Sequence, residues 1–443
     1  MKIQLSDHFS YKKLIKFTLP TIIMMIFSSI YGVVDGLFIS NCIGSDAFAG
    51  MNLIMPILII VASVGFMLGT GGSALVSKIL GSGDTEKANK VFSMLCYLLI
   101  IIGVIFSIFG VIFMQPIASL LGAKGQVLND CTTYGIIITI AMTPYLLQNF
   151  FQSFLVVAEK PTMGLIISVI AGVTNILFDF LFIVVFKMGV FGAAFATALS
   201  QVVGGIVPLI YFIGKNKSPL KLCKAKFNLK LILKTCANGS SEMLSNISAS
   251  IITILFNMQL MKFAGYDGVT AYGIIMYIGF IFSGTYLGYS IGSAPIVSYH
   301  YGSDNKEELK SLFKKSLKLI CISSIVMIIL AEILARPLAS IFVSYDENLL
   351  KMTTTAIRIF SLSYLMSGIN TYASSFFTAL NNGGASATIS FMRTFVFEIA
   401  AILILPILFK INGIWFSVIV AEFLSLIVSI IFFIVKRKKY QYI

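Results

Sequence analysis

Charged side chains are scarce in this chain of 443 residues: Asp, Glu, Lys and Arg together make up only 11% of the sequence. Hydrophobic residues make up 58%, and the mean hydropathy is +0.96. So few charges cannot cover the surface of an ordinary soluble domain, which excludes that class of protein. The composition instead indicates a membrane protein.

Groups that support common enzyme chemistry are also scarce. The chain has two histidines and six cysteines, and no C-x-x-C pair occurs. Two histidines leave no set of ligands for a metalloenzyme, and the cysteines indicate neither a zinc site nor a disulfide framework. No G-x-x-x-x-G-K-[ST] motif occurs, and "GTGGSALVSK" lies at the end of an apolar run without the strand of a phosphate loop. We therefore predict a protein that is not an enzyme, has no built-in ATP motor and has no bound cofactor.

Apolar runs of about 20 residues recur along the whole chain, and each is long enough to cross a bilayer as a helix. Strand-like alternation is absent from them, so a barrel is excluded. The sequence predicts an all-α membrane protein with twelve transmembrane helices. We expect them near 14–40, 52–77, 92–115, 131–157, 162–186, 190–214, 235–261, 270–298, 316–335, 352–380, 385–409 and 413–435. Pro144 falls inside one of these runs, where it offers a bend.

The net charge of +14 raises the question of a nucleic-acid partner. With the N-terminus in the cytoplasm, about 24 of the 32 Lys and Arg lie in cytoplasmic segments, which is the pattern of a membrane protein. We therefore expect the lipid bilayer and no nucleic acid as a partner. We predict a multi-pass protein of the cell inner (plasma) membrane with both termini in the cytoplasm. The first run is too long for a signal peptide and is expected to be retained.

The longest polar stretch divides the twelve runs into six and six. It is "KNKSPLKLCKAKFNLK", residues 215–230. We predict an N-lobe over 1–214, a basic cytoplasmic linker over 215–234 and a C-lobe over 235–443. The halves share a local repeat, in which "GGSALVSKILGSGDTEKANKVF" from residue 71 matches "GSAPIVSYHYGSDNKEELKSLF" from residue 292.

The repeat predicts two pseudo-symmetric six-helix lobes. Because six helices separate the copies, both halves have the same orientation and are related by an axis along the membrane normal. Such lobes commonly enclose a central cavity that opens alternately to either side of the membrane.

Several stretches together resemble the multidrug and toxic compound extrusion (MATE) transporters, with the opening stretch closest to their bacterial multidrug branch. They are "YGVVDGLFISNCIGSDAFAGMNLIMPI" (31–57), "GSGD" (81–84), "NILFD" (175–179), "GAAFATALSQ" (192–201) and "LNNGGASATISFMRTFVFEIAAILILP" (380–406). The resemblance covers essentially the whole chain. It implies secondary active efflux of bulky, often cationic organic compounds, coupled to inward movement of H⁺ or Na⁺.

Buried carboxylates are costly in a membrane, so each one needs a physical reason. The predicted spans contain Asp35, Asp179, Glu242, Glu398 and Glu422, with Glu332 near the end of one. Asn175 and Asp179 are one helical turn apart on one face, where they can bind one small cation or hold a proton. Structural hydrogen bonding to neighbouring helices is the alternative reading. The resemblance implies that Asp35, Asn175, Asp179 and Thr197 together form a cation-coupling site that takes H⁺ or Na⁺.

Substrate contacts are harder to predict. Gln148, Asn149 and Gln152 give one predicted helix a polar side, and we expect them to contact the substrate together with Glu242. Some MATE relatives pair an acid at the position of Glu242 with a second one three helices later, but residues 357–377 contain no acid, so a complete second ion site is not implied.

Arg393 is read as structural or gating. Glu398 is five residues further on, too far round the helix for a good pair, so Arg393 is expected to pair across helices.

A flippase for a polyprenyl-linked or other lipid is the alternative function, since it could use the same architecture. Its anionic substrates would favour cavity Arg and Lys, whereas the predicted spans contain only Arg358 and Arg393 well inside. We expect small organic cations as substrates and a monomer as the working unit.

Overall fold

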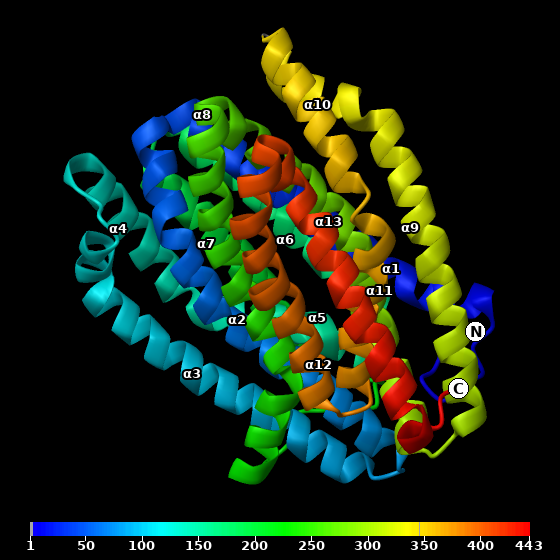
Figure 1. The fold of residues 1–443 in the computed structure, drawn as a ribbon. Helices are drawn as coiled ribbons and strands as arrows, with labels where there is room; N and C mark the ends of the chain where they lie inside the picture. The colour runs from blue at the N-terminus through cyan, green and yellow to red at the C-terminus, as the bar shows by residue number, and fades with distance from the viewer. Residues whose placement is uncertain (1–2, 345) are drawn as a thin grey trace.

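The computed structural model describes residues 3–344 and 346–443, apart from the side chains of residues 45 and 46, and every regular element in these ranges is helical (Figure 1). The first half contains α1 (Tyr11–Phe38), η1 (Ile39–Ile43), α2 (Ser45–Gly81), α3 (Thr85–Leu120), α4 (Gly125–Ile140), α5 (Met142–Val157), α6 (Pro161–Asp179), η2 (Phe180–Val185) and α7 (Gly189–Ile213). The second half contains α8 (Leu229–Gly302), α9 (Lys306–Val343), α10 (Glu347–Ser361), α11 (Tyr364–Ala379), α12 (Gly383–Ser390), η3 (Phe391–Glu398) and α13 (Ile399–Tyr440). The segments η1, η2 and η3 are π-helical.

These elements make the twelve predicted spans. Two long helices each contain two spans, because α8 breaks at Gly265 (φ 60°, ψ −149°) and α13 breaks at Lys410 (φ 51°, ψ −132°). Two other spans are made of two helices each, α4 with α5 and α10 with α11. The predicted twelve-helix fold in two lobes is confirmed. The helices extend further than the apolar runs, and α8 begins at Leu229, inside the segment predicted as a linker.

The bend between α4 and α5 has a local cause. The two helices meet at an angle of 59°, and Pro144 lies in the first turn of α5. Proline has no N–H to donate to the carbonyl one turn earlier, so the helix ladder is interrupted there.

The two copies of the sequence repeat contact each other where the two lobes meet. A Cβ on Gly81 of α2 would collide with the carbonyl oxygen of Tyr299 in α8, and a Cβ on Gly302 would collide with the carbonyl oxygen of Lys78. The repeat relates Gly81 to Gly302 and Lys78 to Tyr299. Reciprocal contacts of this kind require a twofold rotation between the lobes, whose axis passes between these residues. Glycine is required because the helix backbones are in direct contact.

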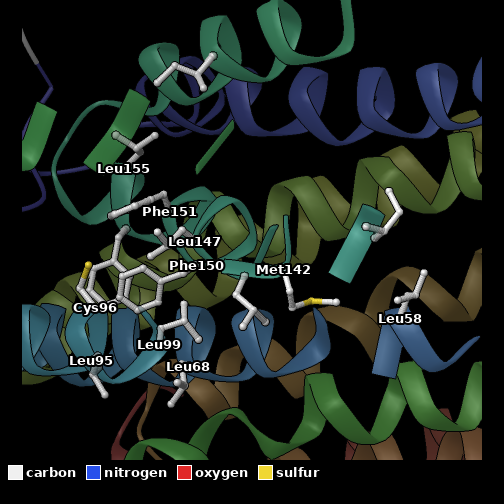
Figure 2. Packing of buried hydrophobic residues seen from close by; sticks show 14 of the residues in the cluster. Leu58, Leu68, Leu95, Cys96, Leu99, Met142, Leu147, Phe150, Phe151 and Leu155 are labelled. Carbon is white, nitrogen blue, oxygen red and sulfur yellow. The ribbon is translucent and has the colours of Figure 1, made fainter. Parts of the chain in front are cut away.

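The N-lobe has an apolar core made mainly by α2, α3 and α5. Figure 2 shows Leu68 of α2, Leu95 of α3 and Phe150 of α5 among its members. Phe150 stacks on Phe154, with ring centroids 4.2 Å apart. This packing holds α5, which carries the predicted substrate residues, rigidly against α2 and α3.

The outer surface is strongly apolar. Several isoleucines of α3 and α9 are more than half exposed, among them Ile105, Ile112 and Ile333. Such a surface would be unfavourable in water and matches the hydrocarbon of a bilayer. The chain is therefore a multi-pass membrane protein.

Both termini lie at one end of the bundle, called here the terminal end, and share one hydrophobic cluster (Figure 1). Residues 3–10, called here the strap, cross between the lobes at this end. The backbone N–H of Leu5 donates to Glu159 between α5 and α6 (3.1 Å), and that of Phe9 donates to Glu308 of α9 (2.9 Å).

Candidate functional site

Three helices of the N-lobe bring the four predicted coupling residues together. Asp35 comes from α1, Asn175 and Asp179 from α6, and Thr197 from α7. The amide nitrogen of Asn175 lies 3.3 Å from the hydroxyl of Thr197, which in turn lies 3.4 Å from Oδ1 of Asp35. All but Thr197 are buried, and Asp179 has no exposed surface. Asp35 is therefore buried although it lies near the end of its helix.

Three oxygen atoms of this site are left without donors in the described residues. Within residues 3–344 and 346–443, neither carboxylate oxygen of Asp179 accepts a hydrogen bond, and neither does the amide oxygen of Asn175. Asp179 lies beside Asp35, close enough for the carboxyl groups to interact. Two neighbouring carboxylates repel each other unless a proton or a cation neutralises them. Hard oxygen ligands of this kind suit an alkali cation as well as a proton.

A cavity of about 210 Å³ opens in front of these residues. Its walls include Asp35, Asn175 and Thr197 on one side and Gln148 of α5 on another. The tyrosines at positions 31, 134 and 145 and the amide of residue 201 also line it. Sequence reasoning missed positions 31, 134 and 201. The first and last are one helical turn from Asp35 and from Thr197, so the same one-face argument could have found them.

The predicted substrate residues fall into different places. Gln148 lines the N-lobe cavity, whereas Asn149 points toward α2 and lies 3.4 Å from the carbonyl oxygen of Ala62. Gln152 lines a small gap beside Gln148, and its amide oxygen is buried without a donor in the described residues. Glu242 is half-buried on α8 and lines neither this cavity nor the one described below.

The C-lobe contains an ion pair between helices. The guanidinium of Arg393 in η3 donates to Oε1 of Glu422 in α13 from Nε at 2.9 Å and from a terminal nitrogen at 2.5 Å. Its other terminal nitrogen donates to Thr371 at 3.0 Å. Asn370 donates to the second carboxylate oxygen of Glu422 at 2.7 Å. The prediction that Arg393 pairs across helices is confirmed.

A second cavity of about 240 Å³ lies beside this ion pair. Arg393, Glu422 and Glu398 are its charged wall residues, and Tyr272 and Tyr364 are among its aromatic ones. Each lobe thus has its own polar cavity with acidic and aromatic walls, built from different residues.

All three π-helical segments contain or directly follow residues of these two sites. The segments η1 and η2 follow Asp35 and Asp179 in their helices and contact each other. Arg393 and Glu398 lie within η3. Each hydrogen bond of a π-helical turn spans one residue more than in an α-helix, which widens the helix locally. Such turns are frequent at functional sites.

Comparison with known families agrees with this architecture. The model of the MatE family matches residues 20–181 and 242–404, one copy in each lobe. The chain belongs to the MATE family of transporters. The two matched stretches cover most of both six-helix halves.

Individual MATE relatives match over nearly their whole length. The chain is 26% identical to the multidrug export protein MepA of Staphylococcus haemolyticus (strain JCSC1435) over 93% of this chain and 90% of that protein. It is 25% identical to MepA of Staphylococcus aureus (strain MRSA252), covering 95% and 93%. A solved outward-facing structure of a multidrug resistance MATE family transporter superposes with a TM-score of 0.93 at 21% identity, covering 100% of this chain and 99% of the other. That structural likeness concerns the fold.

Proposed function

We propose that this MATE protein is a secondary active multidrug exporter of lipophilic organic cations, driven by antiport with H⁺ or Na⁺. The observation that carries the proposal is the buried, donor-free carboxylate of Asp179 beside Asp35. A cation or proton bound between the two removes their repulsion. Loss of the ion restores the repulsion.

Coupling follows from linkage. If the site binds its ion more tightly in one conformation of the lobes than in the other, the ion gradient supplies free energy for the conformational change. Asp35 and Asp179 lie on α1 and α6, so a change in their charge acts directly on the packing of two helices. The drug would leave as the ion enters.

Aromatic walls favour organic cations as substrates. Three tyrosines line the N-lobe cavity, and aromatic faces attract cations by cation–π contact. The relatives named multidrug export proteins support this class. A lipid flippase would need free basic groups for phosphate. Arg393 is instead engaged by Glu422, and Arg358 lies 3.6 Å from Glu332.

The same proposal includes orientation and assembly. The basic residues of the terminal end favour a cytoplasmic location for that end, with the chain in the plasma membrane. The contacts between the lobes lie within one chain, so a monomer can perform the whole cycle.

Dye efflux from everted vesicles tests the proposal. Separate Na⁺ and proton gradients would be imposed, and at least one should drive ethidium transport by the parent protein. Asp179→Asn removes the titratable group and should abolish gradient-driven transport. The matched control is Glu332→Gln, which changes a carboxylate outside both cavities and should leave transport within about twofold. Undiminished transport by Asp179→Asn would refute the coupling site, and absence of dye transport by the parent would favour the flippase.

A further inference from the structure

A basic cavity lies at the terminal end of the molecule, between the beginning of α9 and the end of α13. Its volume is about 350 Å³, and its wall residues are Lys310, Arg437, Lys438, Gln441 and Ile443. The three basic residues are exposed, and within residues 3–344 and 346–443 none of them forms an ion pair. Even when the carboxylate of Ile443 is counted, two positive charges remain in excess. The cavity therefore favours an anionic ligand.

The chain after α13 holds the walls of this cavity in place. Tyr440 and Tyr442 are buried, and the ring centroid of Tyr442 lies 4.8 Å from that of Phe313 in α9. Between the two tyrosines, Gln441 has left-handed backbone angles (φ 54°, ψ 40°). Its N–H donates to the carbonyl oxygen of Arg437 at 2.8 Å. The chain therefore turns back toward α9, and the cavity is formed before any ligand binds.

Helix electrostatics explains only part of this basic cluster. Arg437 and Lys438 lie in the last turn of α13, where a positive charge interacts favourably with the carbonyl end of the helix. Lys310 lies instead near the beginning of α9, where a positive charge is unfavourable and where Glu307 and Glu308 occupy the first turn. A bound anion offsets the repulsion among the three basic side chains.

An apolar stripe leads from the cavity along α13 toward the middle of the membrane. Ile434 precedes Arg437 by three residues and Lys438 by four, so one face of the helix carries all three. Ile431 continues this face, and Ile431 and Ile434 are 52% and 53% exposed. Such a stripe contacts acyl chains where the basic side chains reach the polar interface. An anionic lipid matches both the charge and the stripe, whereas a soluble phosphate compound matches only the charge.

We propose that this basic cavity binds the phosphate group of an anionic phospholipid, with an acyl chain along Ile431 and Ile434. The guanidinium of Arg437 donates to the phosphate oxygens, and Lys310 and Lys438 supply further positive charge. Because the lipid contacts α9 and α13 together, it holds the ends of these two helices at the membrane surface. The site lies outside the two interior cavities and is not a transport site. It requires the terminal end to lie at a membrane–water interface, and it does not depend on the proposed export.

Native mass spectrometry of the purified full-length protein in detergent tests the site, with phosphatidylglycerol and phosphatidylcholine titrated together. We expect one phosphatidylglycerol to be retained per chain, at least tenfold more tightly than phosphatidylcholine. Joint replacement of Lys310, Arg437 and Lys438 by glutamine should weaken this binding at least tenfold, and Ile434→Ser should weaken it about threefold. Every changed residue is exposed, so the variants should fold, and thermal unfolding in detergent checks this.

The matched control removes three positive charges from another exposed segment. Lys221, Lys224 and Lys226 lie between α7 and α8, and joint replacement of these lysines by glutamine should leave phosphatidylglycerol binding within about twofold. Equal weakening in the two triple variants would overturn the proposal, because it would show a general attraction between the basic end and anionic lipid. Equal retention of the two lipids by the parent protein would overturn it as well.

A competition experiment separates a lipid from a soluble phosphate compound. Glycerol 1-phosphate carries the phosphate without acyl chains, so it should displace phosphatidylglycerol only at concentrations at least a hundredfold higher than those at which the lipid binds. Displacement at equal concentrations, together with unchanged lipid binding in Ile434→Ser, would overturn the lipid assignment and identify a site for soluble phosphates.

Discussion

Asp179 and its neighbours differ in what they can supply to a bound ion. Asp35 and Asp179 contribute charge, whereas Asn175 and Thr197 contribute neutral oxygens. We expect Asp35→Asn and Asp179→Asn to lose gradient-driven efflux. Asn175→Ala and Thr197→Ala should retain about a tenth or more of the parental efflux rate, because loss of a neutral ligand weakens ion binding less than loss of a charged one. Initial rates of dye efflux from vesicles compare the four variants. Near-parental rates in both aspartate variants would contradict it.

The pair between Arg393 and Glu422 has a predicted effect on stability. Glu422→Ala leaves a largely buried guanidinium unpaired, so the free energy of unfolding should fall by about 3 kcal/mol. Replacing both residues by leucine should lower the free energy of unfolding clearly less, because no unpaired charge remains. Glu332→Ala is the matched control: its pair with Arg358 is exposed, since the Glu332 side chain is 40% accessible, and its loss should cost less than about 1 kcal/mol. Thermal unfolding in detergent compares these variants.

At the scale of elements, the contact between α2 and α8 depends on glycine. Gly302→Ala places a methyl group against the carbonyl of Lys78, so the two helices must separate. Alanine normally stabilises a helix by about 1 kcal/mol relative to glycine, and the clash opposes this gain. We expect slower disulfide cross-linking between cysteines introduced at positions 82 and 303 of this variant.

Gly273→Ala is the control for that experiment, because a Cβ there meets no atom within 4 Å. It should leave the cross-linking rate unchanged. The symmetry-related Gly81→Ala should behave like Gly302→Ala. A normal rate in both variants would show that this end of the interface is looser than the structure indicates.

The strap is an element that depends on one carboxylate. Glu308 accepts from the Phe9 N–H and lies 2.5 Å from Nδ1 of His8. Glu308→Ala should release the strap and with it the first turn of α1, so that trypsin cleaves after Lys12 and Lys13 several-fold faster. The neighbouring Glu307 is exposed and lies in the same helical turn, so Glu307→Ala serves as the control. Equal cleavage of the two variants would argue against the role of Glu308.

For the whole molecule, the prediction concerns orientation. Lys87, Lys221 and Lys310 are exposed at the terminal end, whereas Lys124 is exposed at the α3–α4 turn, at the opposite end of α3. In a protein without its native cysteines, a single cysteine at 124 should react with an impermeant maleimide added to whole cells, while cysteines at 87, 221 and 310 should not. Reaction at the last three would reverse the proposed topology.

Much of the fold was predictable because its causes are local. Apolar runs determine where helices cross hydrocarbon, and the repeat implies two related lobes. The breaks inside spans were predictable only in part: Pro144 explains the bend before α5, but no proline marks the corresponding break between α10 and α11. Backbone geometry there depends on packing against the other helices.

The sequence by itself determined the helical pairing of Asn175 with Asp179, because four residues make one turn. Their approach to Asp35 and Thr197 was predictable only through family resemblance, since α1, α6 and α7 are distant in sequence. Tertiary structure alone decided that Arg393 forms its ion pair with Glu422. Which carboxylate the guanidinium meets depends on which helices are adjacent, and that is set by the packing of the whole lobe.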